Sequence, residues 1–415
     1  MATSGSARLL TACVILTLVA GCSGTGPARR QPQGASPPAT APATARGGGT
    51  PVLTTPTTSA PGASAREPAD PTGSDRAGCA VTLPRSWQRA LTDGRVDVPD
   101  GERLEVQLAA ADGTTFAVST REGKQHRLQW RRGNQHGTVQ DFGLRHPDWQ
   151  VLSPTFDGRH LAYRVDQSLT SFDDFSLYLW DSATKKAPVQ VTHGERDPDG
   201  ALMATPFVDP VLAKGWLYWT QTQDQDPEHT VLSGYRIDDG HREVISRGFG
   251  RAPVRFGDHL VWADSDRAGQ TSSLRFLDLA THKRVPTPQA LRTVTGIFYL
   301  AGDRDTLVWV AGAKGDQVWA YRSSWSAPHL LVARARTPQF PHIAGDVVVF
   351  GQPDAMYAAD LRSWSYTQVT PRYGGISADD GPVITVGYAP NTKSSRSVQS
   401  LLDTREVPPL GRVGC

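Results

Sequence analysis

The feature that most constrains the fold of this chain is a unit that recurs seven times after residue 79. Each copy has a turn carrying Gly or Asp, a short β-rich strand that often ends in an aromatic residue, a loop, and a second strand that often runs into Asp. Successive turns lie about 36 to 57 residues apart and average about 45, the spacing of four-stranded propeller blades. We therefore predict an all-β fold, a β-propeller of seven four-stranded blades, with six or eight blades as alternatives. The seven turns are Asp112-Gly113, Asp157-Gly158, Lys214-Gly215, Gly257-Asp258, Asp303–Asp305, Gly345-Asp346 and Asp380-Gly381.

The second strand of the unit also follows a rule. Three segments, Leu177–Thr184, Leu274–Thr281 and Met356–Leu361, each run from apolar residues into Asp and then into a turn. A carboxylate at a strand end can accept backbone N–H groups within the turn, and this is our interpretation of these residues. A ring of acidic residues that binds a metal is the alternative. We predict no metal and no cofactor.

One unit resembles a known family closely. The segment Ser153–Tyr163, followed by Leu177–Asp181 and Val189–Thr192, is similar to the blade signature of TolB-like β-propellers, with Thr155-Phe156 inserted between its Pro and Asp. The segment Tyr366–Thr370 repeats the last element, and the other units keep only the hydrophobic rhythm of a TolB-like or WD-repeat-like propeller. The resemblance implies a platform for interactions, because the blade motif of the family holds no catalytic group.

The N-terminal residues predict where the protein is located. A single Arg8 precedes the apolar run Leu9–Gly21, which is too short to span a bilayer and has the length of a signal-peptide core. The run ends in Val19-Ala20-Gly21-Cys22, which resembles the bacterial lipobox. We predict a lipoprotein signal peptide over residues 1–21, lipidation of Cys22 and an extracytoplasmic protein anchored to the bacterial cell membrane. The alternative is an ordinary secretory signal.

The stretch that follows has the composition of a linker. Of the 56 residues 23–78, 44 are Pro, Gly, Ala, Ser or Thr, and none is aromatic. Such a segment cannot bury enough apolar surface to offset the entropy lost on ordering. We predict that residues 22–78 form a disordered tether, which could carry O-linked sugars, and that residues 79–415 form the propeller.

The cysteines fit an exported protein. Cys13 leaves with the signal peptide and Cys22 takes the lipid, so Cys79 and Cys415 remain, one at each end of the predicted propeller. An oxidising compartment permits a disulfide between them, and we predict that bridge. Two unrelated free thiols are the alternative.

Aromatic residues and loops are the remaining candidates for a binding site. All 33 aromatic residues follow residue 79, and several end the first strand of a unit. An apolar ring at one position of every blade is what packing between neighbouring sheets requires, so we interpret these residues as core, with sugar stacking as the alternative. The polar insertions Asp166–Ser176 and Gln221–Thr230 are candidate partner contacts. The strand-ending aromatics are Tyr163, Trp219, Trp262, Trp309 and Phe350.

Catalytic and metal-binding motifs are missing from the sequence. It contains no Gly-x-Ser-x-Gly elbow, no His-Glu-x-x-His and no Cys-x-x-Cys. The segment Asp264-Ser265-Asp266 with Gly269 resembles a calcium loop, but it lacks the third ligand and the distal Glu. We interpret it as a solvated loop.

Charge and motifs together favour a binding role. Residues 1–78 hold six Arg and three acidic residues, so the remaining chain carries 37 basic and 38 acidic residues, a balance that argues against nucleic acid as a partner. We predict a non-catalytic platform that binds a protein or a cell-envelope component. The alternative is a propeller enzyme that acts on a polysaccharide or peptide through residues that converge at the central channel.

Overall fold

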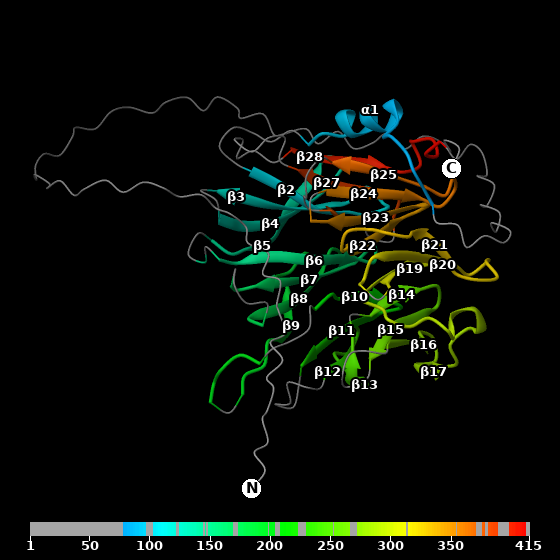
Figure 1. Cartoon of the computed structure of the whole chain (residues 1–415). Coiled ribbons are helices and arrows are strands. Elements are labelled where there is room, and N and C mark those ends of the chain that lie inside the picture. Colours follow the sequence, from blue (N-terminus) through cyan, green and yellow to red (C-terminus); the bar gives the residue numbers. More distant parts are fainter. Residues whose placement is uncertain are drawn as a thin grey trace, which may run out of the picture. The chain divides into compact units, whose positions relative to one another are not determined.

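The seven repeats fold as successive antiparallel units, and Figure 1 labels most of their strands, numbered in chain order. The computed structural model describes residues 78–96, 103–121, 124–143, 146, 148–168, 173–197, 199–203, 208–222, 230–251, 253–265, 272–312, 314–353, 355–370, 376–377, 381–388 and 398–411. These residues all belong to one compact unit, Pro51–Cys415. The other unit, Met1–Thr50, lies outside them, as do the predicted signal peptide, the tether up to residue 77 and Cys22.

Each predicted turn precedes the second strand of a unit. The first unit comprises β2 (Arg103–Ala109), β3 (Thr115–Arg121), β4 (Lys124–Arg132) and β5 (Gln135–Asp141); the second β6 (Gln150–Phe156), β7 (His160–Asp166), β8 (Phe175–Asp181) and β9 (Val189–His193); the third β10 (Val211–Ala213), β11 (Trp216–Thr222), β12 (Thr230–Arg236) and β13 (Arg242–Gly250); the fourth β14 (Val254–Phe256), β15 (His259–Ser265), β16 (Ser272–Asp278) and β17 (Lys283–Val285). The fifth unit comprises β18 (Tyr299–Gly302), β19 (Thr306–Ala311), β20 (Gln317–Arg322) and β21 (His329–Val332); the sixth β22 (Gln339–Ala344), β23 (Val347–Gln352), β24 (Ala355–Asp360) and β25 (Ser365–Thr370); the seventh β26 (Ile376–Ser377), β27 (Val383–Tyr388) and β28 (Val398–Asp403).

The described strands form six hydrogen-bonded sheets, where seven separate sheets were predicted. The difference arises because β13 continues beyond its pairing with β12. Its last residues, Phe249 and Gly250, pair with Ser265 and Asp264 of β15, which joins the third and fourth units into one eight-stranded sheet.

The core lies between neighbouring units. The first strands of successive units contact one another from β2 through β22, and β2 also contacts β27 and β28, so the units close into a ring. Figure 1 shows β28 beside β2. The strand-ending aromatics Tyr163, Trp219, Trp262, Trp309 and Phe350 are all buried in the clusters between units, which confirms that they pack the core.

The N-terminal part of the described chain closes the ring. Gly94 O accepts a hydrogen bond from Leu401 N (2.8 Å), and Val96 N donates to Gln399 O (2.9 Å), so this segment lies along β28 as an added edge. Arg95 and Ser400 form an antiparallel bridge between these two bonds. The seventh unit therefore obtains its outer edge from the opposite end of the chain.

A helix and a short strand that the sequence did not predict complete this closure. The helix α1 (Arg85–Asp93) buries Trp87 against the seventh unit, where the indole Nε1 donates to Pro408 O (2.9 Å). The strand β1 (Cys79–Ala80) pairs in parallel with β25 as a fifth strand of the sixth unit. A single-turn 3₁₀ helix, η1 (Gln289–Leu291), lies between β17 and β18. Within the described residues no helix is long and apolar enough to cross a membrane.

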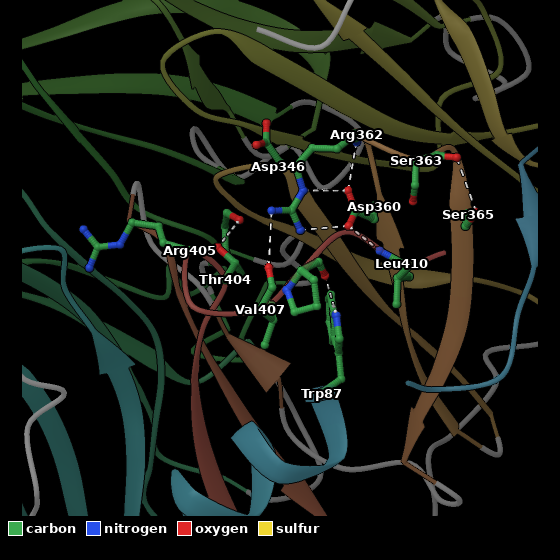
Figure 2. Close-up of polar contacts among 12 residues, drawn as sticks. Trp87, Asp346, Asp360, Arg362, Ser363, Ser365, Thr404, Arg405, Val407 and Leu410 are labelled. Atoms are coloured by element: carbon green, nitrogen blue, oxygen red, sulfur yellow. Dashed lines mark hydrogen bonds and ion pairs between the residues drawn. The ribbon is translucent and has the colours of Figure 1, made fainter. Parts of the chain in front are cut away.

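Asp360 fastens the C-terminal segment to the sixth unit, as Figure 2 shows. Its buried carboxylate accepts hydrogen bonds from the Arg362 guanidinium (3.0 and 2.8 Å), from Arg362 N (2.8 Å) and from Leu410 N (3.0 Å). The side chain of Asp360 therefore accepts hydrogen bonds both from the backbone of its own turn and from a distant backbone N–H group in the C-terminal segment.

Candidate functional site

A cavity of about 930 Å³ lies along the axis of the ring. The first strands of six units, β2, β6, β10, β14, β18 and β22, supply most of its lining, and Gly381 of the seventh unit completes it. This cavity is the central channel of the propeller, and the side chains that reach it come from parts of the sequence far from one another.

Prolines shape the channel wall. Pro154, Pro210, Pro253 and Pro341 all line the cavity, one in each of four units. A first strand is hydrogen-bonded on one side only and faces the channel with its other edge, so proline is tolerated there. Each proline removes one backbone N–H donor, and this biases the wall towards hydrogen-bond acceptors.

Two residues in the first strands that line the channel have a left-handed backbone, as does Lys214 (φ 50°) in the turn of the third unit. Ser153 (φ 47°) and Phe340 (φ 46°) each precede one of the prolines, and the pairing register of β6 and of β22 shifts at these positions. Positive φ costs about 1 kcal/mol or more for a residue with a side chain, and such strain concentrates at ligand sites. Bulges of this kind re-aim side chains, here along the lining of the channel.

Asp209 is the most perturbed acid of the lining. Its Oδ1 accepts a hydrogen bond from Ser153 Oγ (2.5 Å). Burial raises the pKa of Asp209 to about 6, although the Ser153 hydroxyl and the charge of Arg164 act in the opposite direction. Directly behind the wall, Arg164 forms a buried ion pair with Asp166, whose pKa burial also raises to about 6.

Glu105 is a second acid in the channel. It is half-buried in β2 and lines the cavity. Its carboxylate makes no hydrogen bond or ion pair with any other described residue, unlike Asp112 and Asp157, which also line the channel but accept backbone N–H groups of their own turns. Glu105 is therefore available to a ligand.

Basic residues lie near the turns at one end of the channel. Lys214 pairs with Asp258 (3.0 Å), and the Arg255 Nε donates to Gly257 O (3.2 Å). Arg304 is exposed, lines the cavity and has no side-chain partner within the described residues. Positive and negative groups therefore lie at different depths of the channel. The basic groups lie beside the turns, whereas Glu105 and Asp209 lie further from the turns.

The acids at the strand ends cap turns, as predicted. Asp181 accepts Ala183 N (2.8 Å), Asp278 accepts Thr281 N (2.7 Å) and Asp360 accepts Arg362 N (2.8 Å). The described part of the chain has no group of three or more residues that could hold a metal ion.

The calcium-like loop is only partly described. Asp264 accepts a hydrogen bond from Arg275 Nε (3.2 Å), whereas Asp266 and Gly269 lie outside the described residues. Most of the insertion Gln221–Thr230 and the middle of Asp166–Ser176 lie outside them as well.

The structure places Cys79 at the start of β1, while Cys22 and Cys415 fall outside the described residues. Lipidation and the disulfide therefore remain predictions. Sequence patterns did not identify four residues of the channel lining as site residues, namely Ser153, Asp209, Glu105 and Phe340. The available signal was a proline that recurs a few residues before the turn in the second, third, fourth and sixth units.

Comparisons with known proteins support the fold. No family model matches the sequence, and no curated protein matches it. A solved structure of a prolyl endopeptidase is similar over 78% of this chain, with a TM-score of 0.50 and 13% sequence identity. The chain spans half the length of that structure. At this identity the likeness shows the β-propeller fold and nothing finer.

Proposed function

We propose that this chain is a lipid-anchored, extracytoplasmic β-propeller of TolB-like type that binds a ligand in its central channel and catalyses no reaction. The channel, with a volume of about 930 Å³, carries this proposal, because residues with a left-handed backbone in two of its first strands line it. The Glu105 carboxylate and the Arg304 guanidinium also line it, and neither has a side-chain partner among the described residues. The ligand is part of a protein or of a cell-envelope component that the anchored propeller meets outside the cytoplasm.

The channel offers a direct test through a variant that fills it. Ala111 is exposed and lines the cavity, so Ala111→Trp should obstruct it without disturbing the core. Ala183, in the exposed turn after β8, provides the matched Ala183→Trp control. Molecules retained from a cell-envelope extract would be compared by mass spectrometry for the three proteins. We expect retention by the wild type and by Ala183→Trp only, whereas equal retention by Ala111→Trp would place the binding surface elsewhere.

A second candidate function is hydrolysis of a peptide or polysaccharide. It is favoured by the Asp209 carboxyl, whose raised pKa of about 6 suits proton transfer near neutral pH. Turnover of such a substrate by the wild type, lost in Asp209→Asn, would establish this function. Binding without turnover would support the platform.

The anchor requires its own test. The lipobox Val19–Cys22 predicts that cells incorporate labelled palmitate into the wild-type protein and not into Cys22→Ser. Wild-type protein without label would remove the lipid anchor from the proposal and leave channel binding untouched.

A further inference from the structure

Four residues of the channel lie at a common depth. Ser153, Asp209, Tyr299 and Phe340 each lie four or five residues before the turn that ends the first strand of their unit. All these turns face the same end of the ring, because each follows the first strand of its unit. Because they are separated from their turns by similar numbers of residues, these four residues lie at a similar depth in the channel. At about 3.3 Å per residue they form a layer about 15 Å from the turns.

One side of this layer attracts a cation. Asp209 belongs to the third unit and Glu105 to the first. Glu105 precedes its turn by seven residues, but a bulge between Val106 and Leu108 shortens this separation, and Glu105 pairs with Val118 of β3. Between them lies Ser153 of the second unit, whose hydroxyl donates to Asp209. Two carboxylates without a basic partner in the lining at this depth favour a positively charged group.

The other side of the layer is aromatic. Tyr299 and Phe340, from the fifth and sixth units, pack with ring centroids 5.1 Å apart and line the cavity. Aromatic faces attract cations, and an ammonium group between carboxylates and rings is bound from both sides. The four prolines also lower the number of backbone N–H donors in the channel wall. This suits an ammonium group, which donates hydrogen bonds and accepts none.

The turn end of the channel has the opposite preference. Arg304 lacks a side-chain partner within the described residues, and Arg255, whose Nε donates to Gly257 O, lines the same cavity. Asp112 and Asp157, the carboxylates of the lining at this end, already accept hydrogen bonds from their own turns. An anionic group is therefore favoured here, about 15 Å from the layer that favours a cation.

We propose that the channel binds a zwitterionic ligand lengthwise, with a primary ammonium group between Asp209, Glu105 and the Tyr299–Phe340 pair, and a carboxylate at Arg304. This inference rests on the proposed channel function and names the chemical class of its ligand. An extended peptide of about five residues with free termini separates its two charges by about 15 Å. A short peptide is therefore the simplest molecule with the required spacing.

Isothermal titration calorimetry with four peptides tests this inference. The peptides are penta-alanine, its N-acetyl form, its C-terminal amide and the form blocked at both ends. We expect penta-alanine to bind, and each single block to weaken binding about tenfold, because each removes one charge-assisted contact. Asp209→Asn should reduce the penalty for acetylation, because Glu105 remains, and keep the penalty for amidation, whereas Arg304→Gln should remove the penalty for amidation and keep that for acetylation. Asp239→Asn, in an exposed turn outside the cavity, should leave all four affinities unchanged.

Two results would overturn the inference. If the doubly blocked peptide binds as tightly as penta-alanine, the termini are not recognised. If the wild type binds none of the four peptides, the zwitterionic class is wrong. Neither result contradicts channel binding itself, because the comparison of Ala111→Trp with Ala183→Trp tests that function without assuming any ligand class.

Discussion

Single carboxylates have opposite effects in this propeller according to their surroundings. The Asp360 carboxylate is 0% exposed and fully engaged by Arg362 and Leu410, so it stabilises the fold. The Asp209 carboxyl has one hydrogen-bond donor and lines the channel, and burial there disfavours its charge. The first residue stabilises the fold, whereas the burial of the second costs stability, as expected for a residue that the proposed function assigns to ligand binding.

Asp360→Ala should destabilise the protein strongly. The change leaves Arg362 without its carboxylate and the buried Leu410 N without an acceptor, a loss of about 3 kcal/mol in the free energy of unfolding. Urea unfolding followed by tryptophan fluorescence measures this loss. Asp239→Ala, which removes an exposed ion pair with Arg236, is the control and should change stability much less. Equal unfolding midpoints for the two variants would contradict the role given to Asp360.

Asp209 should make stability fall as the pH rises from 4 to 7. Because the folded-state pKa of about 6 exceeds the ordinary value of 3.8, the folded protein holds this proton more tightly than the unfolded chain. Its contribution is complete below about pH 4 and is lost as the pH rises through 6, by about 1–3 kcal/mol. Asp209→Asn should flatten this part of the pH profile of unfolding free energy. Asp239→Asn should not, because the pKa of Asp239 is lowered to about 2.

At the scale of elements, the closure of the ring depends on close backbone approach at Gly94. A Cβ atom at this position would lie 1.9 Å from Leu401 O, so the edge formed along β28 could not survive Gly94→Ala unchanged. We expect a loss of about 2 kcal/mol or more and faster proteolysis near residue 94. Gly411→Ala provides the control, because no atom lies within 4 Å of the added Cβ. Native-like stability of Gly94→Ala would show that the closure is dispensable.

The elements also show which parts of the fold the sequence could predict. The turns and the aromatic strand ends repeat, so local patterns located Trp219 and Trp262 in the core correctly. The helix α1 does not repeat, and it depends on packing Trp87 against the distant seventh unit, which no local pattern reports. The pairing of β13 with β15 arises likewise from tertiary contact between two units. Asp209 and Phe340 were missed as site residues because only closure of the ring makes them line one cavity.

At the scale of the whole molecule, both ends of the described chain reach the sixth unit. Cys79 N donates to Trp364 O (2.9 Å), Trp364 N donates to Asp360 O (2.9 Å), and Leu410 N binds the Asp360 carboxylate. The five residues after Leu410 can extend over at most about 17 Å, enough for Cys415 to return towards β1. This arrangement supports the predicted Cys79–Cys415 disulfide, which would join the two ends of the propeller.

The disulfide should protect the closure of the ring as a whole. Alkylation without reductant, followed by mass spectrometry of the peptides, should leave Cys79 and Cys415 unmodified in the wild type. The double variant Cys79→Ser, Cys415→Ser should lower the free energy of unfolding by at most about 5 kcal/mol. The stabilisation is large because a disulfide that closes a long loop removes more conformational entropy from the unfolded chain than one that closes a short loop. The loss should vanish when the wild type is measured in reductant. If both thiols are alkylated in the oxidised protein, the packing of α1 and the strand pairings of β1 and Gly94–Val96 hold the ring closed without a covalent link.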